Sequence, residues 1–176
     1  MEKNIFPGDL PKITADYITK IDNLQKELSA TTDLEAGREI SRQILKLKNE
    51  ADLELKEYYT ANMSNIPIQF NENIKNEFYE IQTIIIKNIR FNEIELAVRV
   101  NTLDQIKNSQ FLYMKFADKN GNEIPGWIVM ILPPGNSNGG ISEFSGTYIG
   151  IENLVNADML IIKTREEYEN STSLNY

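Results

Sequence analysis

The sequence contains neither histidine nor cysteine, and both absences restrict its chemistry. They exclude Ser-His-Asp and Cys-His nucleophilic arrangements, thiolate zinc sites, imidazole-ligated metals and a disulfide framework. The side chains that remain support carboxylate, lysine or tyrosine chemistry, or bind hard cations such as calcium through oxygen atoms. We therefore expect a protein that is not an enzyme, with no catalytic residues, no cofactor and no metal site.

Basic residues and long apolar runs are also scarce. The chain has 18 lysines and arginines against 26 aspartates and glutamates, a formal net charge of −8. No segment combines basic residues with aromatics as a nucleic-acid groove requires, so DNA and RNA are not expected partners. The longest apolar runs, residues 84–86 and 127–132, are far shorter than the roughly 20 residues of a membrane helix. The sequence predicts no membrane span.

The start of the sequence does not resemble a secretory signal. Met1 is followed by Glu2, Lys3 and Asn4, where a signal would have a basic start and an apolar stretch. If Met1 is the native start, we expect a cytosolic protein or a component of a larger assembly. If a signal or lipid-attachment segment has been removed, the protein is extracytoplasmic. The localisation is therefore unknown from the sequence.

A first amphipathic helix is predicted for residues 14–28. Before it, Pro7-Gly8-Asp9 and Pro11 indicate an irregular lead-in. Within it, four apolar residues recur at spacings of four, three and four, and so lie on one stripe. These residues are Tyr17, Ile21, Leu24 and Leu28.

A second helix is predicted from a capping box formed by Thr32 and Glu35 to about Asn62, roughly thirty residues or about 45 Å. Its stripe comprises Ile40, Ile44, Leu47, Ala51, Leu55 and Tyr58. The short connection between the helices predicts an antiparallel hairpin. The shorter first helix does not cover the second from end to end, so some apolar side chains of the second helix are left without a contact in the hairpin. The candidate association surface consists of Leu34, Leu45, Leu53, Tyr58 and Tyr59. Either the rest of the fold covers these residues or another subunit or partner protein does.

Beyond Pro67 the pattern changes from helical to alternating. In residues 93–100, Ile94, Leu96, Val98 and Val100 alternate with polar residues, which is typical of a half-buried antiparallel strand. The polar alternates include Glu93 and Glu95, whose carboxylates are explained by a solvated strand face without catalysis. Further strands are predicted at residues 79–89, 111–116, 127–132, 147–151 and 159–164, with weaker signals at 68–70 and 142–144.

This strand spacing favours an α+β fold, an antiparallel helical hairpin followed by an immunoglobulin-like antiparallel β-sandwich. We assign residues 1–64 to the hairpin, 65–166 to the sandwich domain and 167–176 to a polar tail. The fold is similar to small sandwiches of bacterial envelope and viral structural proteins, but no motif identifies a family.

Three segments are candidate sites. Asp118, Asn120 and Asn122 alternate as calcium ligands do, but Gly121 is out of register for an EF-hand, so we predict a hairpin turn. The glycine-rich loop 133–140 lacks the residues of a phosphate-binding loop and is a candidate contact loop through Asn136 and Asn138.

Trp127 is the only tryptophan, and two interpretations of it stay open. The apolar run 127–132 indicates a central strand covered on both faces, with Trp127 in the core. Alternatively, Trp127, Tyr113 and Tyr148 form an aromatic platform that stacks against a sugar ring.

Two functions from different classes follow. The first is a non-enzymatic structural or assembly module that makes protein–protein contacts, with a protein partner or a second copy of the chain. The alternative is an extracytoplasmic, lipoprotein-like module that binds a glycan or peptide through the sandwich. The long second helix favours the first hypothesis.

Overall fold

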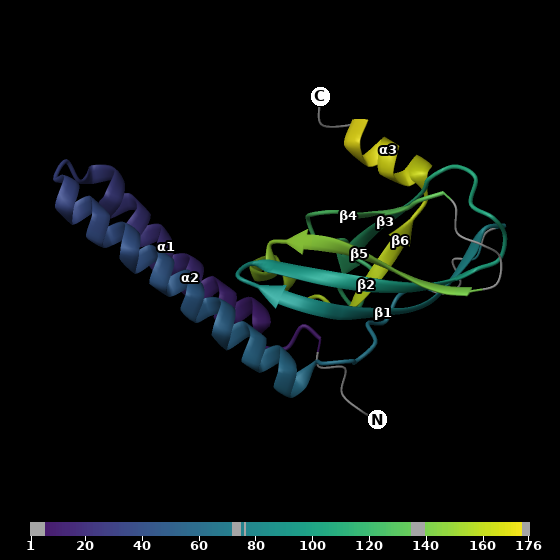
Figure 1. The fold of residues 1–176 in the computed structure, drawn as a ribbon, viewed down its shortest axis with the longest axis horizontal. Helices are drawn as coiled ribbons and strands as arrows, with labels where there is room; N and C mark the ends of the chain where they lie inside the picture. Colours follow the sequence, from purple (N-terminus) through teal and green to yellow (C-terminus); the bar gives the residue numbers. More distant parts are fainter. Residues whose placement is uncertain (1–5, 72–74, 76, 135–139, 174–176) are drawn as a thin grey trace.

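The structure of the protein, a computed structural model, describes residues 6–71, 75, 77–134 and 140–173. It has an α+β fold in which two N-terminal helices pack as a hairpin and are followed by two three-stranded antiparallel sheets. Figure 1 shows the hairpin on one side, with its far end pointing away from the sheets. The predicted hairpin and antiparallel sheets are thus confirmed.

The hairpin consists of α1, Leu10–Ala30, and α2, Leu34–Asn62. The first helix begins earlier than predicted, because Pro11 lies in its first turn, where a missing N–H costs nothing. The predicted capping box at Thr32 is also wrong. Asp33 is the N-cap, and its Oδ1 accepts from the backbone N–H groups of Glu35 and Ala36, donors that have no partner within the helix.

The base of the hairpin is fastened to the sheets. α1 lies against the short 3₁₀ helix η1, Ile151–Leu154, and α2 lies against β1, Tyr79–Arg90. The Tyr59 hydroxyl donates to the backbone oxygen of Ile86 at 2.8 Å. Earlier in α2, the carboxylate of Asp52 accepts from the backbone N–H of Phe91 in the turn that follows β1. These contacts fix how the hairpin leaves the sheets.

The first sheet has the order β1-β2-β5 and the second the order β4-β3-β6, with antiparallel pairing throughout. The remaining strands are β2 Glu93–Thr102, β3 Gln110–Ala117, β4 Ile128–Leu132, β5 Gly140–Ile149 and β6 Met159–Lys163. A final helix, α3, spans Arg165–Ser173. The weak signal at 142–144 belongs to β5, while residues 67–70 form isolated bridges with Ile85 and Leu160.

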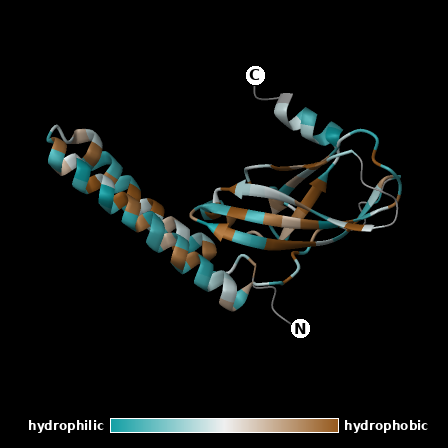
Figure 2. Cartoon of the chain, viewed as in Figure 1, coloured by the Kyte–Doolittle hydropathy of each residue, from teal (hydrophilic) through white to brown (hydrophobic). Residues whose placement is uncertain are grey.

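One core lies between the sheets and continues into the base of the hairpin. The predicted inward face of β2 is confirmed, since Ile94, Leu96, Val98 and Val100 are all 0% exposed. They share a cluster with Leu112, Met114 and Phe116 of β3 and with Leu10 and Leu55 of the hairpin. Figure 2 shows hydrophobic and hydrophilic residues following one another along these strands, as expected for sheets with one buried face.

One prediction about the C-terminal half is corrected. The run 127–132 is not covered on both faces, because Val129 is 41% and Ile131 55% exposed. An unbroken apolar run indicates a strand but not what lies over its outer face, and here part of that face is open. The segment 167–176, predicted as a polar tail, contains most of α3.

Candidate functional site

The most distinctive surface of the protein is the outward side of the β4-β3-β6 sheet. Cross-strand pairs Phe111 with Ile131 and Tyr113 with Val129 place these four side chains next to one another. Trp127 precedes β4, and Tyr168 comes from α3. We call Phe111, Tyr113, Trp127 and Tyr168 the aromatic face.

Tyr168 joins the members of this face. Its ring stacks on Tyr113 with centroids 4.2 Å apart, and meets Trp127 edge-on with centroids 5.1 Å apart. Both are favourable arrangements of aromatic rings. Phe111 stacks at 6.2 Å from Tyr113. Because α3 is otherwise polar, Tyr168 is its main apolar contact with the sheet.

An ion-pair network borders the aromatic face. The Lys115 ammonium lies 4.7 Å from the centroid of the Trp127 ring, a cation–π distance, and its Nζ is 3.1 Å from Glu123 Oε2. The other oxygen of Glu123 pairs with Lys163 of β6. Hydrogen bonding by Lys163 and Lys115 outweighs partial burial and holds the pKa of the Glu123 carboxyl below its usual value. Glu123 therefore stays ionised at neutral pH.

The structure separates the residues of the predicted platform. Trp127 is half-buried at the surface and lies outside β4, so its placement in the core is wrong. Tyr148 is 1% exposed in the core, meets Phe116 edge-on, and donates to the backbone oxygen of Pro125 at 2.9 Å. Trp127 and Tyr113 do share one surface, but Tyr148 is not part of it.

Two other members of the predicted binding set, Asn136 and Asn138, lie outside the described residues. Tyr168, which contributes to the aromatic face, was not among the site residues predicted from the sequence. The sequence did contain a local signal for α3, because Thr164 and Glu167 form a capping box. Glu167 Oε2 accepts from Thr164 N at 2.7 Å, and Thr164 Oγ1 accepts from Glu167 N at 3.2 Å. That motif predicts a helix but not where the helix packs.

The candidate association residues of the hairpin fall into two groups. Leu34, Leu45 and Leu53 are 73%, 60% and 60% exposed. Tyr58 and Tyr59 are instead half-buried at the base, where the Tyr58 hydroxyl accepts from the backbone N–H of Asp9 at 2.9 Å. Only the leucines therefore present an open apolar surface.

The Asp118 loop forms the predicted turn. The Asp118 carboxylate accepts from the backbone N–H groups of Asn120 and Asn122 and from the Asn122 side-chain amide, at 2.8 to 2.9 Å. These bonds keep the pKa of Asp118 below its usual value. Gly121, at φ +83°, adopts the left-handed conformation that the turn requires. The carboxylate thus serves the turn itself.

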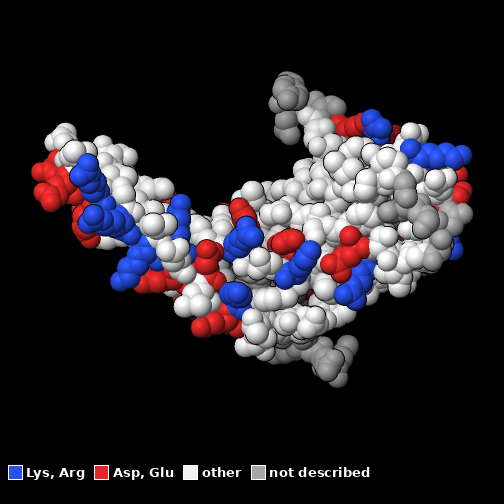
Figure 3. Space-filling view, viewed as in Figure 1, with Lys and Arg blue, Asp and Glu red and all other residues white. Residues whose placement is uncertain are grey.

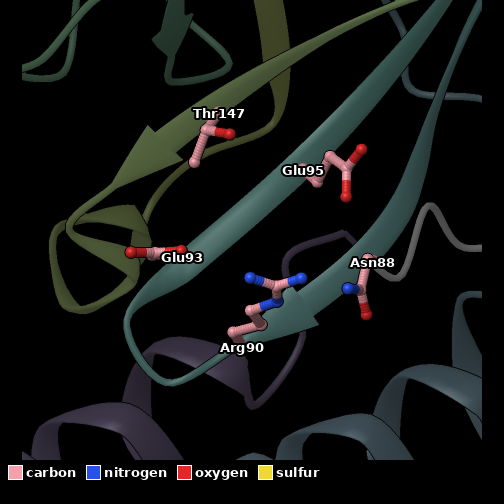
Figure 4. A pocket seen from close by; sticks show the side chains of 5 residues that line it. All are labelled: Asn88, Arg90, Glu93, Glu95 and Thr147. Atoms are coloured by element: carbon pink, nitrogen blue, oxygen red, sulfur yellow. The ribbon is translucent and has the colours of Figure 1, made fainter.

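The outward side of the β1-β2-β5 sheet is charged. Figure 3 shows basic and acidic side chains interspersed across the face it presents. Glu143 pairs with Arg99 at 3.2 Å and Lys87 with Glu95 at 3.7 Å. A hollow of about 60 Å³ lies among Asn88, Arg90, Glu93, Glu95 and Thr147 (Figure 4). This volume has room for little more than a water molecule or two, whereas the sites of small-molecule ligands span about 300 to 1,000 Å³.

Within the described part of the chain, no helix is long and apolar enough to cross a membrane, and no three acidic side chains gather as a metal site would require. The surfaces that distinguish the protein are thus the aromatic face with the apolar residues of β4, and the exposed leucines of the hairpin. Comparison of the chain with protein-family models, with curated proteins and with solved structures gave no match.

Proposed function

We propose that the protein is a non-enzymatic assembly module whose helical hairpin binds another protein. The observation that carries this proposal is the pair Leu34 and Leu45, 73% and 60% exposed on α2. These residues are eleven positions apart, which is close to a whole number of helical turns at 3.6 residues per turn. They therefore lie on one face of α2, and both precede Asp52 and Tyr59, which fasten the base of the helix to the sheets.

A groove at the tip of the hairpin supports this face as a contact surface. It has a volume of about 500 Å³ and is lined by residues of the interhelical turn and of both helices. Leu28 and Leu34 supply apolar surface. Arg38 and Arg42 supply positive charge beside Asp33, and Arg42 also pairs with Glu39 at 3.3 Å. This combination suits an amphipathic helix with acidic flanks, a common partner for an apolar groove.

The test replaces both leucines at once. Leu34→Gln with Leu45→Gln keeps helix propensity but removes the apolar contact, so we expect the variant to fold normally and to lose the partner that the parent captures from the cells that produce it. Leu53→Gln is the matched control, because Leu53 is as exposed as Leu45 but about 80° around the helix from it. Equal capture by the parent and the double variant would contradict the proposal.

We further propose that the two sheets form an immunoglobulin-like sandwich. The strand orders β1-β2-β5 and β4-β3-β6 support this topology. The chain crosses from the first sheet to the second after β2 and returns after β4, which places β5 beside β2. It then crosses a third time, which places β6 beside β3. Such crossings are typical of Greek-key sandwiches.

A second candidate function is glycan binding by the aromatic face. It is favoured by Trp127, which is only half-buried, since a flat aromatic surface can stack on a sugar ring. Against it, Tyr168 already occupies the face of Tyr113 and Lys115 lies over Trp127. Binding to a glycan array by the parent, lost in Trp127→Ala, would favour this alternative.

A further inference from the structure

The four outer strands of the two sheets differ in how their edges are protected. The edge of β6 is covered by residues 69–71, with Leu160 N donating to Gln69 O at 2.9 Å. β1 carries two register irregularities and a bridge to Pro67. β5 carries Glu143, held by Arg99 and Lys87. These are the devices that prevent a strand edge from pairing with another chain.

Within the part of the chain that the structure describes, none of these devices protects β4. Among the described residues it pairs only with β3, so one row of its backbone N–H and C=O groups faces outward. Its outward side chains Val129 and Ile131 are 41% and 55% exposed, and their neighbour Phe111 is 43% exposed. No charged residue occurs in residues 124–134. An uncharged apolar edge strand readily accepts another strand.

β5 does not close this edge. Its Gly146 lies against the inward side of β4, where a Cβ on Gly146 would come within 2.7 Å of the Met130 Cγ. β5 therefore packs over the core face of β4, and the hydrogen-bonding edge of β4 continues outward from the sheet.

We propose that this edge pairs with the β4 strand of a second copy of the chain. The two strands run antiparallel about a two-fold axis and join two β4-β3-β6 sheets into one continuous sheet. The inference goes beyond the proposed function of the hairpin and uses a different surface. It rests on the free edge of β4, on its exposed side chains and on the symmetry of the pairing.

The sequence of β4 suits pairing with itself. With the axis at Met130, the central residue, Val129 of each copy lies opposite Ile131 of the other, so the exposed side chains form two β-branched cross-strand pairs. Such pairs stabilise antiparallel sheets. Pro125 and Pro133 on either side limit the paired segment to the strand itself, because proline cannot donate to a ladder.

Charge also favours β4 as a contact between two copies. Each chain carries a formal net charge of −8, so two copies repel each other, and the contact is favourable only where the local surface is neutral and apolar. The pairing should therefore strengthen as salt is added, because screening weakens the long-range repulsion and leaves the apolar contact intact.

The test measures the mass of the full chain by light scattering and sedimentation at increasing protein and salt concentrations. We expect the parent to form dimers, more completely at higher salt. Ile131→Lys adds a charge to both copies of a symmetric interface, so it should raise the dimer dissociation constant by about tenfold or more. Ile141→Lys is the matched control, since Ile141 of β5 is 71% exposed and lies outside the contact; it should dimerise as the parent does.

Cysteine pairing gives a second measurement that does not rely on a charged variant. Because the chain has no cysteine, Val129→Cys and Ile131→Cys can each be introduced alone. Oxidation of an equal mixture should yield the mixed disulfide dimer in a larger excess over either symmetric one than random pairing gives. A monomeric parent under all conditions, equal loss of dimer in Ile131→Lys and Ile141→Lys, or a share of mixed disulfide no larger than random pairing gives would overturn the proposal. Loss of dimer on changing Leu34 and Leu45 instead would assign self-association to the hairpin.

Discussion

The side chain of Asn71 pairs with the backbone of Ile162 on β6 as another strand would. Its Oδ1 accepts from Ile162 N at 2.7 Å, and its Nδ2 donates to Ile162 O at 3.2 Å. One side-chain amide thus satisfies both peptide groups of a residue on an outer strand. The result is a closed edge of the β4-β3-β6 sheet, on the side opposite β4.

Asn71→Ala should destabilise the protein, because it leaves the N–H and C=O of Ile162 without these partners in a part-buried position. Each unsatisfied group costs about 1 to 3 kcal/mol, and solvent will recover part of that, so we expect a loss of about 1 to 2 kcal/mol in chemical denaturation. Asn156→Ala, at an exposed asparagine, is the control. A loss no larger than that of the control would show that water replaces the amide fully.

Tyr168→Ala should release α3 from the sheet. The ring contacts both Tyr113 and Trp127, and aromatic pairs contribute about 0.5 to 1.5 kcal/mol beyond area burial. Since Trp127 is the only tryptophan, its emission should shift to the red and become more accessible to acrylamide. Glu166→Ala on the exposed side of α3 should leave the emission unchanged. An unaltered spectrum in Tyr168→Ala would mean that α3 is held by other contacts.

The Glu123 network should make the aromatic face sensitive to acid. The pKa of Glu123 is lowered in the folded state, so its contribution to stability is present above its ordinary value of 4.5 and is lost as the pH falls through the lower folded-state pKa. Glu123→Gln should therefore flatten the decline of the melting temperature below about pH 4.5. Glu166→Gln, an exposed carboxyl, serves as the comparison. Parallel pH profiles for the parent and Glu123→Gln would contradict the linkage.

Leu55 and Leu45, both on α2, should differ sharply in their effect on stability. Leu55 is 0% and Leu45 60% exposed, and Leu55 belongs to the core shared with the sheets. Leu55→Ala should cost about 2 to 5 kcal/mol, whereas Leu45→Ala should cost less than about 0.5 kcal/mol. Guanidinium unfolding of the two variants compares them directly.

The same shared core predicts how the two halves of the chain behave when separated. Leu10, Leu55 and Met63 pack in one cluster with the strands, so a fragment of residues 65–176 should expose part of that cluster and aggregate. A stable, soluble fragment would show that the sheets complete their core without the hairpin.

Much of this architecture could be predicted from local patterns. The spacing of Tyr17, Ile21, Leu24 and Leu28 predicts α1 because a helix repeats every 3.6 residues. The alternation from Ile94 to Val100 predicts β2 because successive strand residues face opposite sides. Both signals depend on a few neighbouring residues, and the helix and the strand that they predict are present in the tertiary structure.

What covers each apolar surface was decided only by the tertiary structure. The run from Trp127 to Leu132 predicts a strand, yet whether its outer face is buried depends on α3, which lies more than thirty residues later in the sequence. Tyr148 and Tyr113 look alike in sequence, but pairing register sends the first into the core and the second to the outer face. Residue spacing therefore determined most helices and strands, and composition excluded chemistry that needs histidine or cysteine. The aromatic face and the open edge of β4 arose instead from contacts between residues distant in the chain.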